Sequence, residues 1–236
     1  GKRTMEKINI ILEAGYIYGI IGNDKNEIVS SIKESNSSKK IYIIKKYFDY
    51  DSYHVNVYYR MIYEIKRRKI MIKDLEKKII DSLKIVGLKQ DILSQNINTL
   101  SSSEKKLIQI ALCLITNPDI IILEEPLLQL DKKREKKVML LLQKIKEQYG
   151  KTIIFFTKNS NTLYQYTNYM IVISNKTIIA QEKTEILFQD VRFLRKHKIE
   201  IPEIVEMTYL AKTKKNIKLE YHKDIRDIIK DIYKHI

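Results

Sequence analysis

The chain of 236 residues has little of several residue types: one cysteine, three prolines, six glycines and no tryptophan. Its single thiol, Cys113, excludes a disulfide within the chain and fits a reducing compartment. Cys113 lies in an apolar helical run, so we expect a small core residue. No apolar run reaches the roughly 18 residues that a membrane-spanning helix needs, and the first residues lack a secretory signal pattern. We therefore expect a cytoplasmic protein whose contact with any membrane is peripheral.

Acidic residues are the scarcer charged class, with 29 Asp and Glu against 44 Lys and Arg, a net charge of +15. Such a balance can attract nucleic acid or anionic lipid. It can also arise from an A/T-rich prokaryotic genome, because Lys, Ile, Asn and Tyr are abundant while Gly, Pro, Ala and Trp are scarce. No basic stripe with stacking aromatics follows the densest basic run, KRRK at 66–69. We favour the compositional interpretation, and nucleic acid is the weaker expectation.

Short β-branched runs alternate with helical patterns, which is typical of an α/β fold with a mainly parallel sheet. Leu107, Ile108 and Ala111 mark one helix, and Val138, Leu141 and Ile145 mark another. The last two expected strands form a hairpin joined through Ser174-Asn175. The predicted strands are INIIL (8–12), YIYGII (16–21), IYII (41–44), DIIILE (119–124), TIIFFT (152–157), YMIVI (169–173) and KTIIAQ (176–181).

The distribution of these patterns predicts two domains. Residues 1–190 form the α/β domain, with a strand-poor helical lobe inserted at about 54–116. Residues 191–236 form a C-terminal helical extension that ends in an amphipathic helix. The apolar stripe of that last helix consists of Ile225, Ile228, Ile229 and Ile232.

A strand of hydrophobic residues ends in two acids, in the run IIILEEP. Ligands of α/β folds bind at the carboxyl ends of the strands, and in P-loop ATPases the first acid there serves Mg²⁺ while the next orients the attacking water. Glu124 and Glu125 occupy these places. Upstream are LSSSE at 100–104 and Asn117-Pro118, and downstream is Leu130-Asp131.

This order of motifs resembles the ATP-binding cassette (ABC) family. The resemblance implies a P-loop NTPase-like nucleotide-binding domain with an inserted helical subdomain. Glu124 would then be a weak Mg²⁺ position, because it is one methylene longer than the family's aspartate, and Glu125 a vestigial catalytic glutamate. Asp131 would belong to the D-loop. The signature loop, which binds the partner's nucleotide, would consist of Ser101, Ser102, Ser103 and Glu104.

The signature loop departs from the family at two positions, where Ser102 and Ser103 replace glycines. Their side chains would crowd the approach of phosphate to the backbone. Ser101 keeps its hydroxyl, so we expect a weakened loop. Ser101 and Glu104 also form a capping-box pattern, which starts a helix without any ligand. Both interpretations can hold together.

The phosphate-binding loop departs further. Aligned on its preceding strand, the family's GxxGxGK[ST] falls on residues 22–30. Gly22 is kept, but Ile28 stands at the lysine and Val29 at the Mg²⁺-binding hydroxyl, followed by Ser30. Asp24 and Glu27 bring carboxylates to the place of a polyphosphate, which they should repel.

Two further family positions carry lysine. Lys46 stands at the glutamine of the Q-loop and Lys158 at the switch histidine of the H-loop, and lysine does not titrate near neutrality as histidine does. We therefore expect a degenerate ABC domain with weak nucleotide binding and little or no hydrolysis at its own P-loop. An active ATPase with an unusual loop is the least favoured alternative.

The residues after the cassette resemble the C-terminal extension of energy-coupling-factor (ECF) transporter ATPases. The matching residues are Phe188, Asp190, Leu194, Ile201 and Pro202. The resemblance implies an impaired subunit of an importer for a vitamin or metal ion, at the inner face of the cell membrane. Its partners would be a competent ABC ATPase, which holds ATP and Mg²⁺, a transmembrane coupling subunit and a substrate-binding membrane subunit. The alternative is a pseudo-ATPase scaffold or a nucleic-acid-associated component that has left transport.

The family's coupling helices would dock on residues 54–73. An apolar contact set for them is Tyr58, Tyr59, Met61, Ile62 and Tyr63, although a core face is the competing interpretation for half of these residues.

Overall fold

The computed structural model describes residues 8–48 and 56–236. Two compact units make up the chain, one formed by the residues up to Asn36 together with those from Ile154 onward, the other by Ser37–Ile153. The strands are β1 (Ile17–Ile21), β2 (Ile41–Ile44), β3 (Ile120–Glu124), β4 (Thr152–Phe156), β5 (Tyr169–Ser174) and β6 (Thr177–Lys183). Among the described residues, the α/β architecture expected from the sequence is confirmed.

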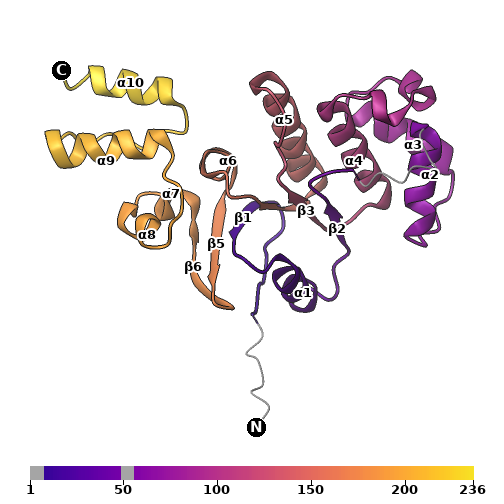
Figure 1. Ribbon diagram of the computed structural model, residues 1–236, viewed down its shortest axis with the longest axis horizontal. Helices are drawn as coiled ribbons and strands as arrows, with labels where there is room; N and C mark the ends of the chain where they lie inside the picture. Colours follow the sequence, from indigo (N-terminus) through magenta and orange to yellow (C-terminus); the bar gives the residue numbers. More distant parts are fainter. Residues whose placement is uncertain (1–7, 49–55) are drawn as a thin grey trace, which may run out of the picture. The chain divides into compact units, whose positions relative to one another are not determined.

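Helices and strands alternate along most of the chain (Figure 1). The helices are α1 (Lys25–Ser35), α2 (Val57–Arg67), α3 (Leu75–Ile85), α4 (Ser102–Thr116), α5 (Lys132–Tyr149), α6 (Ser160–Tyr166), α7 (Thr184–Leu187), α8 (Val191–Lys196), α9 (Glu203–Lys215) and α10 (Ile225–Tyr233), with the 3₁₀ helices η1 (Gln90–Ser94) and η2 (Ile97–Thr99). None of these helices has the length and apolar character required to cross a bilayer.

The unit of residues 37–153 holds the strand order β2-β3-β4, in which β2 and β3 run parallel. Its strands are buried; Ile122 and Leu123 are inaccessible to solvent. After β2 the described residues up to Thr116 form helices and turns and no strand, apart from one isolated bridge between Asn56 and Asn96. The expected strand-poor region is therefore present from residue 56, while 54 and 55 lie outside the described residues. Cys113 is fully buried, and burial raises the pKa of its thiol, as expected for a core residue.

The other unit holds the order β4-β1-β5-β6, since β4 spans the division between the units. β1 and β5 are parallel, whereas β5 and β6 form an antiparallel hairpin. The hairpin was expected, but its turn lies one residue later, at Asn175-Lys176. Both residues have positive φ, 48° and 62°, which is the conformation that two-residue hairpin loops require.

The predicted strand INIIL at 8–12 is wrong, because the described residues 8–13 form no strand. The backbone N–H and C=O groups of Ile10 instead form hydrogen bonds with side chains at the C-terminal end of α1. Its N–H donates to Ser35 Oγ (2.9 Å) and its C=O accepts from Asn36 Nδ2 (2.8 Å). Ile8 and Ile10 are buried, so the apolar pattern reflects packing without strand pairing.

The C-terminal residues form the expected charged helices, and α9 packs beside α10 (Figure 1). Only part of the predicted stripe on α10 is buried. Ile228 is 1% exposed, whereas Ile225 and Ile229 are 38% and 42% exposed. The division at residue 190 stays a prediction.

Candidate functional site

The turn between β1 and α1 contains only Gly22, Asn23 and Asp24, because α1 already begins at Lys25. Asp24 caps this helix. Its Oδ1 accepts from the backbone N–H of Glu27 (3.1 Å), and its C=O accepts from the N–H of Ile28 (3.0 Å). A phosphate cradle needs consecutive backbone N–H groups that point at the ligand. Here two of the amides at the corresponding positions are already bound to Asp24.

Ile28, which the sequence analysis placed at the family's lysine, is a core residue. It is 2% exposed, and a Cβ on Gly22 would lie 2.6 Å from Ile28 Cδ1. Val29 is partly buried and Ser30 is exposed, and both lie within α1. The side chain of Ile28 therefore fills the space next to Gly22.

The charge of Glu27 has a partner that the sequence did not indicate. Lys176 Nζ, in the hairpin turn, lies 3.6 Å from Glu27 Oε1. A cavity of about 150 Å³ beside the turn is lined by both residues and by Asp24. The repulsion of polyphosphate predicted from the two acids is thus partly screened, and Asp24 contributes mainly as a helix cap.

The two acids expected at the carboxyl end of β3 lie there. Glu124 is the last residue of the strand, and both carboxylate residues are partly buried. Glu125 has a φ of +46°, and its C=O accepts from the N–H of Leu128 (3.2 Å). A left-handed conformation is costly for a residue with a Cβ and is concentrated at functional positions.

A buried lysine accompanies these acids and was missed by the sequence analysis. Lys106, in α4, is 4% exposed, and its Nζ has no hydrogen-bond partner among the described residues. Burial lowers the pKa of Lys106 to about 8, and the Glu124 carboxylate acts in the opposite direction. Its ammonium therefore competes with any cation for the negative charge of Glu124. Nothing in the run EKKL at 104–107 indicates that the side chain of Lys106 points into the protein.

The LSSSE run begins α4, and its capping box is complete. Ser101 Oγ accepts from the N–H of Glu104 (3.1 Å), and Glu104 Oε1 accepts from the N–H of Ser101 (3.0 Å). Ser102 is exposed, with its Oγ 3.4 Å from Gln129 Oε1, whereas Ser103 is buried. The helix N-terminus thus forms without a ligand.

Asp131 is the N-cap of α5. Its Oδ1 accepts from the N–H of Arg134 (2.8 Å), and its Oδ2 pairs with the Arg134 guanidinium. The backbone hydrogen bond from Arg134 is the main reason why the pKa of Asp131 lies below its usual value. Asp131 therefore stays ionised, half exposed, at the end of a turn.

The two lysines at the Q-loop and H-loop positions are both exposed. Lys46 Nζ lies 5.3 Å from the centroid of the Tyr47 ring. Lys158 belongs to the turn before α6, in which Thr157 Oγ1 accepts from the N–H of Asn159 (3.0 Å) and Asn159 Oδ1 accepts from the N–H of Thr162 (3.1 Å). The turn is built by its threonine and asparagine, and Lys158 is left at the surface.

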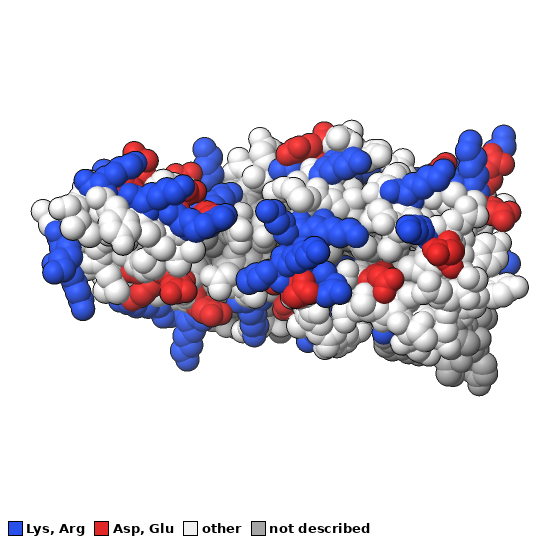
Figure 2. Space-filling view, turned by 90° about the horizontal axis from the view of Figure 1, so that it is seen from above, with Lys and Arg blue, Asp and Glu red and all other residues white. Residues whose placement is uncertain are grey.

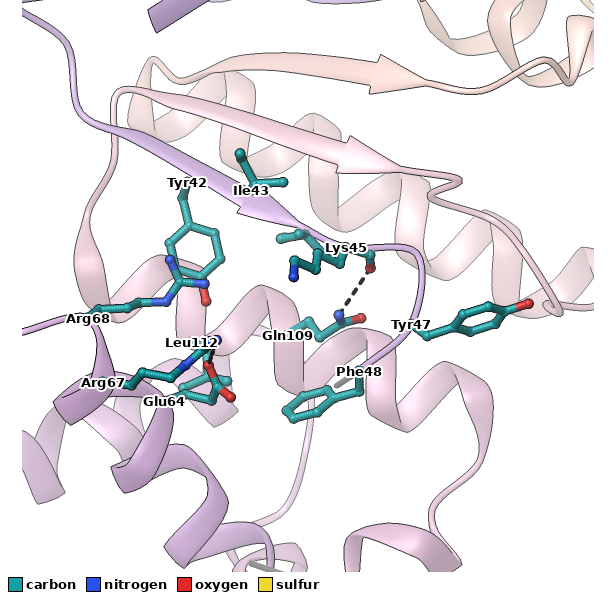
Figure 3. Close-up of a pocket in the computed structure, with 11 residues that line it drawn as sticks. Tyr42, Ile43, Lys45, Tyr47, Phe48, Glu64, Arg67, Arg68, Gln109 and Leu112 are labelled. Carbon is teal, nitrogen blue, oxygen red and sulfur yellow. Dashed lines mark hydrogen bonds and ion pairs between the residues drawn. The ribbon is translucent and has the colours of Figure 1, made fainter. Parts of the chain in front are cut away.

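A groove lies between the end of β2, α2 and α4 (Figure 3). The Arg68 guanidinium lies 3.9 Å from the centroid of the Tyr42 ring, and Arg67 pairs with Glu64 (2.8 Å). Gln109 Nε2 donates to the C=O of Lys45 (3.2 Å). Arg67 and Arg68, two of the four residues of the KRRK run, therefore make contacts within the unit of residues 37–153.

The predicted apolar contact set divides between surface and core. Tyr59 is 63% exposed and packs edge-on against Tyr58. Ile62 and Tyr63 are partly buried. Met61 is fully buried, so for this residue the core-face interpretation holds and it is not part of a contact surface.

We predict that Gly22→Ala lowers the free energy of unfolding by about 1–3 kcal/mol, because its methyl group would overlap Ile28. Ile28→Val removes the overlapping Cδ1 and should cost about 0.5–1.5 kcal/mol alone. The double variant should lose less free energy of unfolding than the two single variants lose together, by at least about 0.5 kcal/mol. Urea denaturation of the four proteins measures this coupling, and strict additivity would show that Ile28 does not fill the turn.

We also predict that Ser101→Ala lowers the free energy of unfolding by about 1 kcal/mol, because it removes the acceptor for the Glu104 amide. Ser102→Ala is the matched control and should change stability by less than about 0.5 kcal/mol, since its hydroxyl is exposed. Equal losses for the two variants in thermal or urea denaturation would contradict the role of the capping box.

The family model described as ABC transporter matches residues 8–128. An energy-coupling factor transporter ATP-binding protein, EcfA2 of Staphylococcus aureus strain MRSA252, is 28% identical over 224 residues, covering 93% of this chain and 78% of the relative. EcfA2 of strain USA300 is 27% identical with the same coverage.

Solved structures share the fold. The cbiO1 protein of Clostridium perfringens, part of the ABC transporter complex cbiONQ, has a TM-score of 0.60 and 20% identity, covering 86% of this chain and 90% of its own. A putative metal-chelate type ABC transporter has a TM-score of 0.65 and 16% identity, with 79% of each chain covered. With the sheet order, the acids after β3 and the capped LSSSE helix, these matches establish that the chain belongs to the ABC transporter family and has the α/β fold of its nucleotide-binding domains.

Proposed function

We propose that this chain is a catalytically impaired ATPase-like subunit of an ECF-type importer, which pairs with a competent ATPase and with a transmembrane coupling subunit. The observation that carries the proposal is the closed turn before α1. Asp24 binds the amides of Glu27 and Ile28, and the buried Ile28 side chain stands where the family has an ammonium. This chain would therefore bind nucleotide weakly and hydrolyse little of it at its own P-loop.

The predicted signature loop at the N-terminus of α4 supports pairing with a competent ATPase subunit. In an ABC dimer each nucleotide lies between the P-loop of one subunit and the signature loop of the other. The N-terminus of α4 is already ordered by Ser101 and Glu104, and a helix N-terminus favours anions. We infer that Ser101, Ser102 and Asp131 act on ATP and Mg²⁺ held by the partner, whereas Glu125 is vestigial.

The groove of Figure 3 supports docking of a membrane subunit. Tyr47 at its rim is 53% exposed, and Phe48, Glu64 and Gln109 line it. The hollow beside Tyr47 is lined by apolar residues such as Ile43 and Leu112 as well as by charged ones, and an exposed aromatic residue at such a rim is suited to anchor a partner. We infer that the coupling subunit binds here, which would hold this chain at the inner face of the membrane during uptake of a vitamin or a metal ion.

The charges support transport over the alternative of a nucleic-acid-associated scaffold. On the face seen in Figure 2, Lys and Arg side chains are interspersed with Asp and Glu. Arg67 pairs with Glu64, and Arg68 stacks on Tyr42. A binding constant for DNA or RNA that falls steeply with salt would instead favour the scaffold.

We predict that Glu125→Gln leaves ATP hydrolysis by the reconstituted complex within about twofold of the unchanged complex, because no hydrolysis depends on this carboxylate. Ser102→Tyr should lower the same activity at least about tenfold, since a bulky side chain at the N-terminus of α4 would block the partner's phosphates. Steady-state phosphate release from the complex, with the partner ATPase unaltered, measures both.

The same variants test the alternative of an active site with an unusual loop. A loss of activity of about 10²-fold or more with Glu125→Gln would overturn the proposal, because removing a catalytic group in a working site costs this much. Tight ATP binding by the isolated chain, measured by calorimetry, would overturn it as well.

We predict that Tyr47→Glu releases this chain from membranes that contain the coupling subunit, because it places a charge at an apolar anchor. Tyr149→Glu is the matched control, since Tyr149 is similarly exposed at 47%, at the end of α5. Co-sedimentation with proteoliposomes measures the difference. Equal retention of the two variants, both folded by circular dichroism, would contradict docking at the groove.

A further inference from the structure

Histidine and carboxylate side chains gather beyond the cassette, between the segment before α10 and α10 itself. Glu220, His222 and Asp231 each offer a ligand atom, and these atoms lie within 4.8 Å of one another. His222 Nε2 lies 3.2 Å from Asp231 Oδ2. The residues come from two segments, and Leu219 and Ile228 beside them are buried, so packing holds the segments in place.

A fourth donor lies one helical turn beyond Asp231. His235 Nε2 is 3.9 Å from Asp231 Oδ1, and His235 lies in the turn that follows α10. Ligand atoms around a tetrahedral zinc ion lie roughly 3.4 Å apart, given bonds of about 2.1 Å. Glu220 and His235 have exposed side chains, which leaves them room to rotate toward a bound ion.

The central carboxylate is positioned as a metal ligand would be. Asp231 is 4% exposed, and its Oδ2 accepts from the N–H of Glu220 (2.9 Å). The Tyr164 hydroxyl donates to the C=O of His222, which anchors the backbone that carries the imidazole. Hydrogen bonds of this kind orient the first ligands of metal sites and raise their affinity.

We propose that Glu220, His222, Asp231 and His235 bind one divalent first-row transition metal, with Zn²⁺ as the best fit. Two imidazoles and two carboxylates suit zinc, cobalt or nickel, whereas Mg²⁺ and Ca²⁺ prefer oxygen ligands alone. The bound ion would join the segment of residues 219–222 to α10 and fix the end of the C-terminal extension. The site lies outside every motif of the cassette and does not depend on the proposed function.

A simpler explanation competes with the metal. Asp231 is already surrounded by partners, since Lys234 Nζ lies 4.0 Å from its Oδ1 and both histidines are near it. In that case the cluster is a set of hydrogen bonds and ion pairs that closes the C-terminal helix. The two explanations differ in one measurable property, the binding of one metal ion by wild-type protein with submicromolar to micromolar affinity.

The test uses the full chain without a histidine tag, stripped of metal, and titrated with Zn²⁺ in competition with a chromophoric chelator. We expect one ion per chain with a dissociation constant of micromolar or below. His222→Ala should weaken binding at least about 100-fold and His235→Ala about tenfold or more. Co²⁺ in place of zinc should show the intense visible bands of a four-coordinate ion, and a 100-fold excess of Mg²⁺ should not displace it.

His197→Ala is the matched control, because His197 packs against Phe193 in α8 and belongs to no such cluster among the residues that the structure describes; it should leave zinc binding unchanged. Buried Cys113 is no competing ligand in the folded chain. Absence of stoichiometric binding, or equal affinity in wild-type and His222→Ala proteins of unchanged melting temperature, would overturn the metal site and leave the ion-pair explanation. Neither result would bear on nucleotide binding at the turn before α1.

Discussion

One helix cap determines what the phosphate-binding region of this chain can do. Because Asp24 accepts from the amide of Glu27 and caps α1 three residues after β1 ends, only Gly22, Asn23 and Asp24 connect strand and helix, and on the proposed function this connection does not wrap around a phosphate group. The consequences follow in order: the first turn of α1 is closed, Ile28 turns inward beside Gly22, and Glu27 reaches Lys176. The amides of Glu27 and Ile28 and the carboxylate of Glu27 thus have partners within the protein.

The same physical device has the opposite effect at α4. Ser101 and Glu104 also bind the amides of their own helix, but that arrangement coincides with the family's signature loop and leaves Ser102 exposed. Helix capping therefore closes the turn before α1 and orders the N-terminus of α4. On the proposed function, the N-terminus of α4 faces a partner's nucleotide, whereas the turn before α1 is occupied by Ile28 and by the pair of Glu27 and Lys176. This asymmetry is the physical basis of the proposed heterodimer.

The sequence predicted the elements whose signals are local. The strands β1 to β6 and the helices α4 and α5 follow from apolar periodicity, and the capping box follows from Ser101 and Glu104 three residues apart. The strand expected at 8–12 is wrong because an apolar run does not reveal whether its backbone meets a strand or the side chains of Ser35 and Asn36. Periodicity also did not show that Met61 faces the core.

The site was predictable in its motifs and unpredictable in its electrostatics. Substitution of the lysine by Ile28 is readable from the sequence, but its burial against Gly22 is a matter of packing. The partner of Glu27 lies about 150 residues away in the hairpin turn, and Lys106 differs from its neighbour Lys105 only in the direction of its side chain. Contacts between distant segments leave no trace in a single sequence. The residues of the cluster around Asp231 are close in sequence, but only the fold of the segment before α10 brings their side chains together.

The closed turn before α1 has a consequence for energy use. In a dimer with two working cassettes, a transport cycle can consume two nucleotides, and either subunit can respond to the ratio of ATP to ADP. On the proposed function, a chain whose own P-loop region is occupied by Ile28 and by paired charges would contribute no such response. On the proposed assignment one nucleotide drives each cycle, so the stoichiometry is halved and the substrate gradient that uptake can sustain is correspondingly smaller.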